Sequence, residues 1–319
     1  MAGMKTHRTK LSIVGAGAVG TALAYAALIR GAATHVALHD INATKVRAEA
    51  LDMAHGSQFL PPHVTVDGSD DVAVTAGSHV VAVAAGAKQQ PGETRMDLAS
   101  KTVEMMKKLI PPLVEQSPDA VFLLVTNPVD VTTQAALKIS GLPVNQVFGS
   151  GTVLDSSRLR WLIAQECGVA VSNVHAYIAG EHGDTETPLW STATIGGVPL
   201  AAWERQMGQL DETVRDRIAD QVVGAAYEVI EGKGATNYAI GLAGTRIIES
   251  VLRDERRVLP VSSMLNDWHG ISEVCMSVPH IVDGSGVGTA LELPLTDNEL
   301  ARLRASADHI RAVARGLGF

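Results

Sequence analysis

The chain has 319 residues, of which 46% are hydrophobic and 19% are charged, a balance typical of a soluble globular protein of about two domains. Its net charge of −8 excludes the basic surface on which nucleic-acid binding depends, so we expect no nucleic-acid partner. An acidic protein that binds an anion must concentrate positive charge locally, and individual arginines are therefore of interest.

Cysteine and histidine usage argues against disulfides and metals. The two cysteines, Cys167 and Cys275, lie in no CxxC or zinc-finger spacing, which predicts a reducing, cytoplasmic location. The eleven histidines form no HExxH-like cluster, so we expect no metal. The apolar segment "LSIVGAGAVGTALAYAALI" imitates a signal peptide, but its glycine spacing marks it as part of the fold, and we expect no membrane partner.

The first half of the chain predicts alternating buried strands and helices. Four near-continuous apolar runs end in Gly, Asp or Asn-Pro: "KLSIVGA", "HVALHD", "HVVAVAAG" and "AVFLLVTNP". Strands buried on both faces have this pattern, which indicates a parallel sheet covered by helices. Between the last two runs, apolar residues recur at helical spacing, and Pro111-Pro112 predicts a bend or an end of that helix.

From about Gly149 the pattern changes to longer amphipathic helices separated by β-branched segments and turns. One of these helices has an apolar stripe made of Val214, Ile218, Val222, Ala225 and Val229. The last helix opens with Thr296 and Glu299 at capping-box spacing. We expect an α/β chain, with a Rossmann-type parallel-sheet domain over 8–149 and an α+β catalytic domain over 150–319.

A glycine-rich turn follows the first strand. In "GAGAVG", Gly15 permits a tight turn, Gly17 lets a pyrophosphate approach the backbone, and Gly20 allows close packing of helix on strand. This pattern alone is a weak signal and is often a mere turn in an Ala/Gly-rich helix. Here the strand and helix context is right, and Asp40 ends the next strand twenty positions later.

Asp40 favours NAD as the cofactor. A carboxylate at this position accepts both ribose hydroxyls of NAD and repels the extra phosphate of NADP. The alternative is that Asp40 caps a helix that begins near Asn42. Gly86 and Ala87, after the third predicted strand, would lie beside the pyrophosphate.

Four polar residues in the middle of the chain suggest a reaction centre. Asn127 directly follows a buried strand, although an Asn before a proline is also a common turn residue. Asp155 and Arg158 stand three apart on a predicted helix and share a face, an arrangement that also suits a surface ion pair. His182 lies in "GEHGD", where a lone histidine is more often structural than catalytic.

Together these residues suit reversible hydride transfer between a nicotinamide and a 2-keto acid. A substrate carboxylate needs the planar fork of an arginine, and a developing alkoxide needs a proton donor with a pKa near 7. Histidine next to a carboxylate fits the second role. A further cation near the oxygen would stabilise the developing charge, and Arg95 on the loop "AGAKQQPGETR" is the candidate.

The sequence resembles the L-lactate and malate dehydrogenase family over its whole length, and within it the bacterial lactate-type members. The motifs that carry the resemblance are "GAGAVG", "AGAKQQPGETR", "VTNPVDV", "GSGTVLDSSRLR", "GEHGDT" and "EGKGATNYAIG". It implies that His182 exchanges the proton, Asp155 orients it and Arg158 binds the substrate carboxylate. Arg95 would polarise the carbonyl, and Asn127 would fix carbonyl and nicotinamide. The implied cofactor-binding residues are Gly15, Gly17, Val19, Gly20, Asp40, Lys45, Gly86, Ala87, Asn127 and Ile240.

The resemblance also implies which acid is bound. The position of Gln89 faces the far end of the keto acid, where malate dehydrogenases carry arginine to pair a second carboxylate. Closing a neutral glutamine over oxaloacetate would bury an unmatched charge, which costs several kcal/mol. Thr236 matches the residue that lines a methyl pocket. We therefore expect pyruvate and lactate as substrates, in glycolysis and pyruvate fermentation, with malate or a bulkier 2-hydroxy acid as the alternative.

A regulatory site is a further expectation. Arg160 lies two residues after Arg158, so on a helix it points away from the reaction centre. Arg160 and His175 match residues that bind fructose 1,6-bisphosphate between subunits in allosteric bacterial relatives. The alternative is a surface arginine and a packed histidine. The family implies a homotetramer.

Two alternatives to a dehydrogenase belong to other functional classes. A non-catalytic NAD-binding protein would be free to lose His182, Asp155 or Arg158, and all three are present. A serine hydrolase using Ser150, His182 and Asp184 is rejected, because no GxSxG elbow surrounds the serine.

Overall fold

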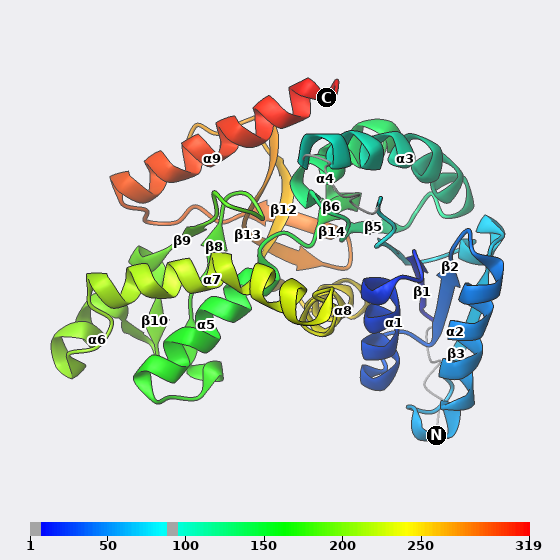
Figure 1. Ribbon diagram of the computed structural model, residues 1–319, viewed down its shortest axis with the longest axis horizontal. Helices are drawn as coiled ribbons and strands as arrows, with labels where there is room; N and C mark the ends of the chain where they lie inside the picture. Colours follow the sequence, from blue (N-terminus) through cyan, green and yellow to red (C-terminus); the bar gives the residue numbers. More distant parts are fainter. Residues whose placement is uncertain (1–7, 88–94) are drawn as a thin grey trace.

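One nine-stranded sheet organises the part of the chain that the computed structural model describes, residues 8–87 and 95–319 (Figure 1). The strand order is β14-β13-β12-β6-β5-β4-β1-β2-β3. Six strands are parallel: β1 (Lys10–Val14), β2 (His35–His39), β3 (Thr65–Ser69), β4 (Val80–Val83), β5 (Val121–Leu124) and β6 (Val147–Gly149). Three are antiparallel: β12 (Arg257–Leu265), β13 (Val274–Asp283) and β14 (Gly286–Ala290).

Helices cover both faces of the parallel strands. They are α1 (Ala18–Arg30), α2 (Ala43–His55), α3 (Arg95–Gln116) and α4 (Val129–Ser140), and α8 (Tyr238–Leu252) packs beside α1. Alternate residues of β4 divide between two cores: Val80 and Ala82 join the cluster that contains α1 and α8, whereas Val81 and Val83 join the cluster of α3 and α4. The continuous apolar runs of the sequence thus have the predicted cause, which is burial on both faces.

The remaining elements lie beside this sheet (Figure 1). The helices are α5 (Val153–Cys167), α6 (Leu200–Met207), α7 (Glu212–Lys233) and α9 (Asp297–Gly316). The strands form two small sheets, β7 (Val174–His175) with β10 (Thr194–Ile195) and β11 (Val198–Pro199), and β8 (Ile178–Ala179) with β9 (Thr187–Pro188). The capping box predicted for α9 is present, since Thr296 and Glu299 bond each other's backbone N–H groups. In the described residues, no helix is long and apolar enough to cross a membrane.

Helix α3, strand β3 and helix α7 differ from what the sequence predicts. Helix α3 continues through Pro111 and Pro112, so it does not end there as one of the two predicted outcomes required. The two prolines have no N–H to donate to the carbonyls one turn earlier, at Lys107 and Lys108, two residues on the exposed side of the helix. Strand β3, "TVDGS", was not predicted from the sequence, because a polar edge strand lacks an apolar run.

The stripe proposed on α7 is only partly buried. Ile218 and Val222 are in the core, whereas Val229 is 38% exposed. The second half of this helix therefore presents apolar side chains outward, and its neighbours Tyr227 and Ile230 are also exposed.

A buried carboxylate ties α8 to α1. The Glu249 side chain is 1% exposed, and its two oxygens accept hydrogen bonds from Arg30 Nε at 3.0 Å and Nη2 at 2.7 Å. Arg246 Nη1 lies 2.9 Å and Arg253 Nη1 3.3 Å from the same carboxylate. These arginines offset the cost of burial, so the pKa of Glu249 stays below its ordinary value although desolvation raises it.

We predict that Glu249→Ala lowers the free energy of unfolding by about 2 kcal/mol, because bonds to a buried charged acceptor are lost and no new partner is gained. Chemical denaturation measures this. Glu115→Ala, at an exposed position of α3, is the matched control and is expected to change stability by less than about 0.5 kcal/mol. Equal effects of the two substitutions would contradict the structural role of Glu249.

Candidate active site

The glycine turn between β1 and α1 has the geometry of a phosphate cradle. Gly15 has φ +102°, and a Cβ there would lie 2.6 Å from the Ala85 nitrogen. A Cβ on Gly20 would lie 1.8 Å from the Gly15 carbonyl oxygen, so the close packing of helix on strand requires glycine. A Cβ on Gly17 meets nothing within 4 Å. This turn is therefore open at Gly17, the N-cap of α1, where the backbone N–H groups and the helix dipole favour an anion.

Asp40 is bound to this turn. Its Oδ2 accepts a hydrogen bond from Ala16 N at 2.7 Å, and its Oδ1 accepts one from Asn42 N at 2.9 Å. The alternative, in which Asp40 caps α2, is wrong, because the N-cap is Asn42, whose side chain accepts from Lys45 N. The half-buried carboxylate thus stands next to the glycine turn with capacity to accept further hydrogen bonds.

The ends of three adjacent parallel strands meet beside the turn. Thr126, after β5, donates to the Ala85 carbonyl after β4 at 2.6 Å, and a Cβ on Gly86 would lie 3.0 Å from the Thr126 methyl group. Asn127 follows at an exposed position. The strand order reverses between β1 and β4, and ligands of open α/β sheets bind at such a point.

Asp155 and Arg158 both lie in the first turns of α5 and form a largely buried ion pair. Arg158 Nη1 donates to Asp155 Oδ1 at 2.6 Å, with side-chain exposures of 17% and 2%. The alternative of a solvated surface pair does not apply, because neither side chain is open to solvent. The pair binds one oxygen of Asp155 and leaves other guanidinium donors available for an anion.

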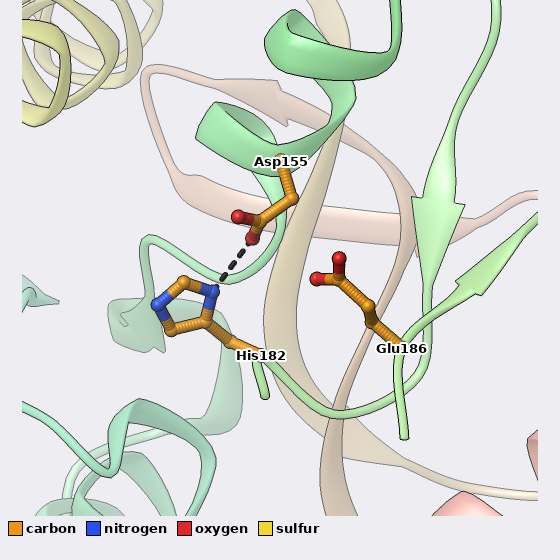
Figure 2. Close-up of side chains that lie close together, drawn as sticks. All are labelled: Asp155, His182 and Glu186. Atoms are coloured by element: carbon orange, nitrogen blue, oxygen red, sulfur yellow. Dashed lines mark hydrogen bonds and ion pairs between the residues drawn. The ribbon is translucent and has the colours of Figure 1, made fainter. Parts of the chain in front are cut away.

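The second oxygen of Asp155 binds His182. The distance from His182 Nδ1 to Asp155 Oδ2 is 2.6 Å, and the imidazole is 25% exposed (Figure 2). With Nδ1 on the carboxylate, Nε2 is the ring atom left to exchange a proton with a ligand. The structure thus brings together Asp155, Arg158 and His182, which are 27 residues apart at most.

The charges of this trio explain their pKa shifts. Burial alone would lower the pKa of His182, but Asp155, with smaller effects of Asp130 and Glu186, outweighs burial and raises the pKa to about 9. Burial would raise the pKa of Asp155, but His182 and Arg158 hold it below its ordinary value. The imidazolium form is therefore the resting state at neutral pH.

Asp130 is a further member of the site that sequence reasoning missed. It is 2% exposed; Oδ2 accepts from His182 N at 2.8 Å, and Oδ1 accepts from Ser262 Oγ at 2.6 Å. Burial raises its pKa to about 6, although both hydrogen bonds oppose the shift. Its position in "VTNPVDV", an acidic residue inside an apolar run after a strand, is the one local signal that would have indicated it.

Glu186, a buried neighbour of the trio, was also not predicted from the sequence. It is 5% exposed and lies beside Asp155 and His182 (Figure 2). Nothing in "GDTETPLW" distinguishes it from an exposed loop glutamate. Asp184, by contrast, accepts a hydrogen bond from Tyr227 OH at 2.9 Å.

The other site residues predicted from the sequence belong to other elements or lie outside the described residues. Gln89 lies outside the described residues, and Arg95 is described only as the first residue of α3. Thr236 is half-buried between α7 and α8, and Ile240 packs on the core beneath the glycine turn. Val19 is half-buried in α1, and Lys45 is exposed in α2.

The predicted regulatory pair lies away from the trio. Arg160 Nε donates to the Ala176 carbonyl at 2.8 Å, and its guanidinium lies 5.0 Å from the centre of the Tyr177 ring. His175, the residue before Ala176, is exposed. Arg160 of α5 is thus bonded to the backbone of the residue that follows His175 of β7.

Comparison with known proteins identifies the family. Residues 9–149 match the lactate/malate dehydrogenase NAD-binding domain, and residues 152–315 match the lactate/malate dehydrogenase alpha/beta C-terminal domain. The chain belongs to the lactate/malate dehydrogenase family. It is accordingly an NAD-dependent oxidoreductase, and the non-catalytic alternative no longer applies.

Curated and solved relatives agree with this assignment. The chain is 54% identical over 313 residues to an L-lactate dehydrogenase of Bifidobacterium animalis subsp. lactis, with 98% of each chain covered. It is 47% identical to an L-lactate dehydrogenase of a Synechococcus strain, covering 95% of this chain and 98% of the relative. The crystal structure of the minor L-lactate dehydrogenase of Enterococcus mundtii superposes with a TM-score of 0.94 at 37% identity, covering 97% and 98% of the two chains.

The cofactor fits the residues present. NAD binds a turn of the kind formed here, with Gly17 open to a pyrophosphate, Asp40 available to ribose hydroxyls, and no acidic side chain in the first turn of α1. When bound, it supplies or accepts the hydride of the reaction.

We predict that Asp155→Asn lowers the pKa of His182 by about 2 units, since the largest group that raises it is lost. A ¹³C NMR titration of the histidine Cε1 resonance measures the shift. Because the folded chain binds this proton more tightly than the unfolded chain, the pair stabilises the wild type below the ordinary pKa of 6.5 and this contribution is lost as the pH rises through about 9.

Asp184→Asn is the control for this measurement, because it removes a carboxylate of the same loop that is bonded to Tyr227. Its His182 titration should match the wild type. An unchanged titration in Asp155→Asn would contradict the assigned cause of the shift.

Proposed function

We propose that the protein is an L-lactate dehydrogenase that reversibly reduces pyruvate to (S)-lactate with NADH in the cytoplasm. The observation that carries this proposal is the trio in which Asp155 bonds both His182 and Arg158. A proton donor and an anion-binding fork stand next to one carboxylate, on and beside α5, the helix that follows the parallel strand β6. Curated relatives at 54% and 47% identity are named L-lactate dehydrogenases, which supports the choice of acid.

The trio gives each residue a distinct task. Arg158 binds the substrate carboxylate with the guanidinium donors that Asp155 does not use. As hydride reaches the carbonyl carbon, His182 transfers the proton from Nε2 to the carbonyl oxygen, and the C–O double bond becomes the alcohol of lactate. Asp155 keeps the ring oriented and stabilises the imidazolium before transfer. In lactate oxidation the same proton returns to His182.

The other predicted residues complete the proposed site. Arg95 would polarise the carbonyl, Asn127 would position carbonyl and nicotinamide, and Thr236 would line the methyl pocket. Residues 8–149 would bind the cofactor together with Ile240, and 150–319 would supply the substrate-binding side chains. Malate or a bulkier 2-hydroxy acid stays as the alternative substrate, and no metal is required by this chemistry.

We predict that the wild type oxidises NADH faster with pyruvate than with oxaloacetate, and that Gln89→Arg shifts the ratio of kcat/KM values toward oxaloacetate by about a hundredfold. The reason is that arginine would pair a second carboxylate that glutamine leaves unmatched, a difference of about 2–3 kcal/mol. Steady-state kinetics with both acids measures the ratio.

Gln90→Arg adds the same charge one position further along the chain and should leave the ratio within about threefold of the wild type. An unchanged ratio in Gln89→Arg, or an equal shift in both variants, would contradict the role of Gln89. A wild-type preference for oxaloacetate would remove the lactate assignment itself.

We further propose that the enzyme is a homotetramer activated by fructose 1,6-bisphosphate at Arg160 and His175. An arginine with a protonatable histidine is a suitable phosphate site, and Arg160 is bonded to the backbone of the residue that follows the exposed His175. Apolar side chains available to other subunits are exposed on α1, α7 and α8, namely Tyr25, Ile29, Tyr227, Ile230, Tyr238 and Leu242.

Fructose 1,6-bisphosphate is expected to raise kcat/KM for pyruvate about tenfold, within the usual range of allosteric coupling. His175→Ala and Arg160→Lys should lose this response and keep the basal rate, since neither residue touches the trio. Arg205→Gln, in α6, is the control. Kinetics with light scattering, with and without the bisphosphate, tests both claims: a wild type without response excludes the effector, and a monomeric mass excludes the tetramer.

A further inference from the structure

One buried carboxyl group beside the trio has no task in the chemistry described above. Glu186 directly precedes β9, is 5% exposed, and its Oε1 has no hydrogen-bond partner among the described residues. A buried acid without full hydrogen bonding is costly in the anionic form. Such a residue calls for a functional explanation.

Glu186 is placed to act on His182 and Asp155. One nitrogen or oxygen atom from each of the three side chains lies within 4.8 Å of the others, and Figure 2 shows the carboxyl group of Glu186 directed toward Asp155. The charged groups that face it are Asp155 and Arg158 from α5, and His182 and Asp184 from its own loop. Asp130 of α4 faces His182 from another side.

These surroundings favour a proton on Glu186 at neutral pH. Burial is the largest cause and the Asp155 carboxylate the next, and together they raise the pKa of Glu186 to about 8, although His182 and Arg158 oppose them. The three side chains do not form a ready metal site, because Asp155 Oδ1 is bonded to Arg158 and Asp155 Oδ2 to His182 Nδ1. Both oxygens of Asp155 and His182 Nδ1 are thus engaged within the site.

We propose that Glu186 is a positioning residue that acts through His182: its carboxyl group is buried next to the His182–Asp155 pair, and when it ionises it strengthens the hold of His182 on its proton, which extends the pH range in which His182 donates. This inference rests on the proposed role of His182 as the proton donor.

The physical basis is that Glu186 and His182 share one buried site, so the protonation of each side chain changes the pKa of the other. While Glu186 is neutral, it adds no negative charge that would compete with the substrate carboxylate for Arg158. When Glu186 ionises, it adds a negative charge close to the imidazolium and strengthens the hold of His182 on its proton. A neutral side chain in place of Glu186 gives the same charge at neutral pH but no such support at alkaline pH.

The test compares Glu186→Gln with the wild type in two measurements. At pH 6.5–7 we expect kcat/KM for pyruvate to agree within about twofold, because both side chains are neutral there. In the variant, the alkaline loss of kcat/KM and the NMR titration of His182 should both occur about half a unit to one unit lower in pH. Glu186→Met, which needs no hydrogen bond for its side chain, repeats the test if the glutamine variant is unstable.

Glu181→Gln is the matched control, because it removes a carboxylate of the same loop that binds Thr185 and faces His309. Its His182 titration should match the wild type. An unmoved titration in both Glu186 variants would overturn the inference, and so would a uniform loss of activity with an unshifted pH profile, which indicates a structural role.

A separate variant shows whether the proposed function itself fails. If His182→Gln retains pyruvate reduction, His182 is not the proton donor. The NMR titration would still report whether Glu186 shifts the His182 proton.

Discussion

The carboxylate of Asp155 is removed from water, and in that position a lone negative charge would be strongly destabilising. It is stable because each of its oxygens faces a cation, Arg158 on one side and His182 on the other. The same two contacts set the orientation of the imidazole, its protonation and the direction of the guanidinium. Substrate binding and proton transfer therefore depend on one buried carboxylate and its two partners.

The geometry of this trio is fixed by the elements that hold the loop over 180–186. Asp130 of α4 accepts from the backbone of His182, and Ser306 of α9 accepts from the backbone of Glu181 at 2.9 Å. Gly180 pairs with Ser277 of β13 as an isolated bridge. Contacts from α4, α9, β13 and α5 thus converge on one short loop, which limits its freedom without burying it in a regular element. Such support from surrounding hydrogen bonds is what holds reacting groups in place.

Local patterns in the sequence predicted much of the fold and part of the site. The glycine turn could be predicted because all three glycines serve one short strand–turn–helix unit, and Asp155 with Arg158 because the helix repeat puts them on one face. The bond from His182 to Asp155 has no local signature; the chemistry of the residue set suggested a histidine next to a carboxylate, and the resemblance to a family assigned the pair. Asp130, Ser262 and Glu186 were missed because their partners lie up to 132 residues away. Strand β3 was missed because it lacks an apolar run, and the continuation of α3 through Pro111 and Pro112 has no local signal in the sequence.

The sheet has a consequence for synthesis of the chain. Strand β6 ends at Gly149, and its outer edge pairs with Ser262 of β12, more than a hundred residues later. The face of α1 that meets α8 is likewise covered by residues near 245. When the ribosome has delivered the cofactor-binding half, that half still has an open strand edge and an uncovered helix. A nascent chain therefore completes the core around the parallel strands only after most of the second half has emerged. Until then the open edge of β6 is a site at which another chain can pair.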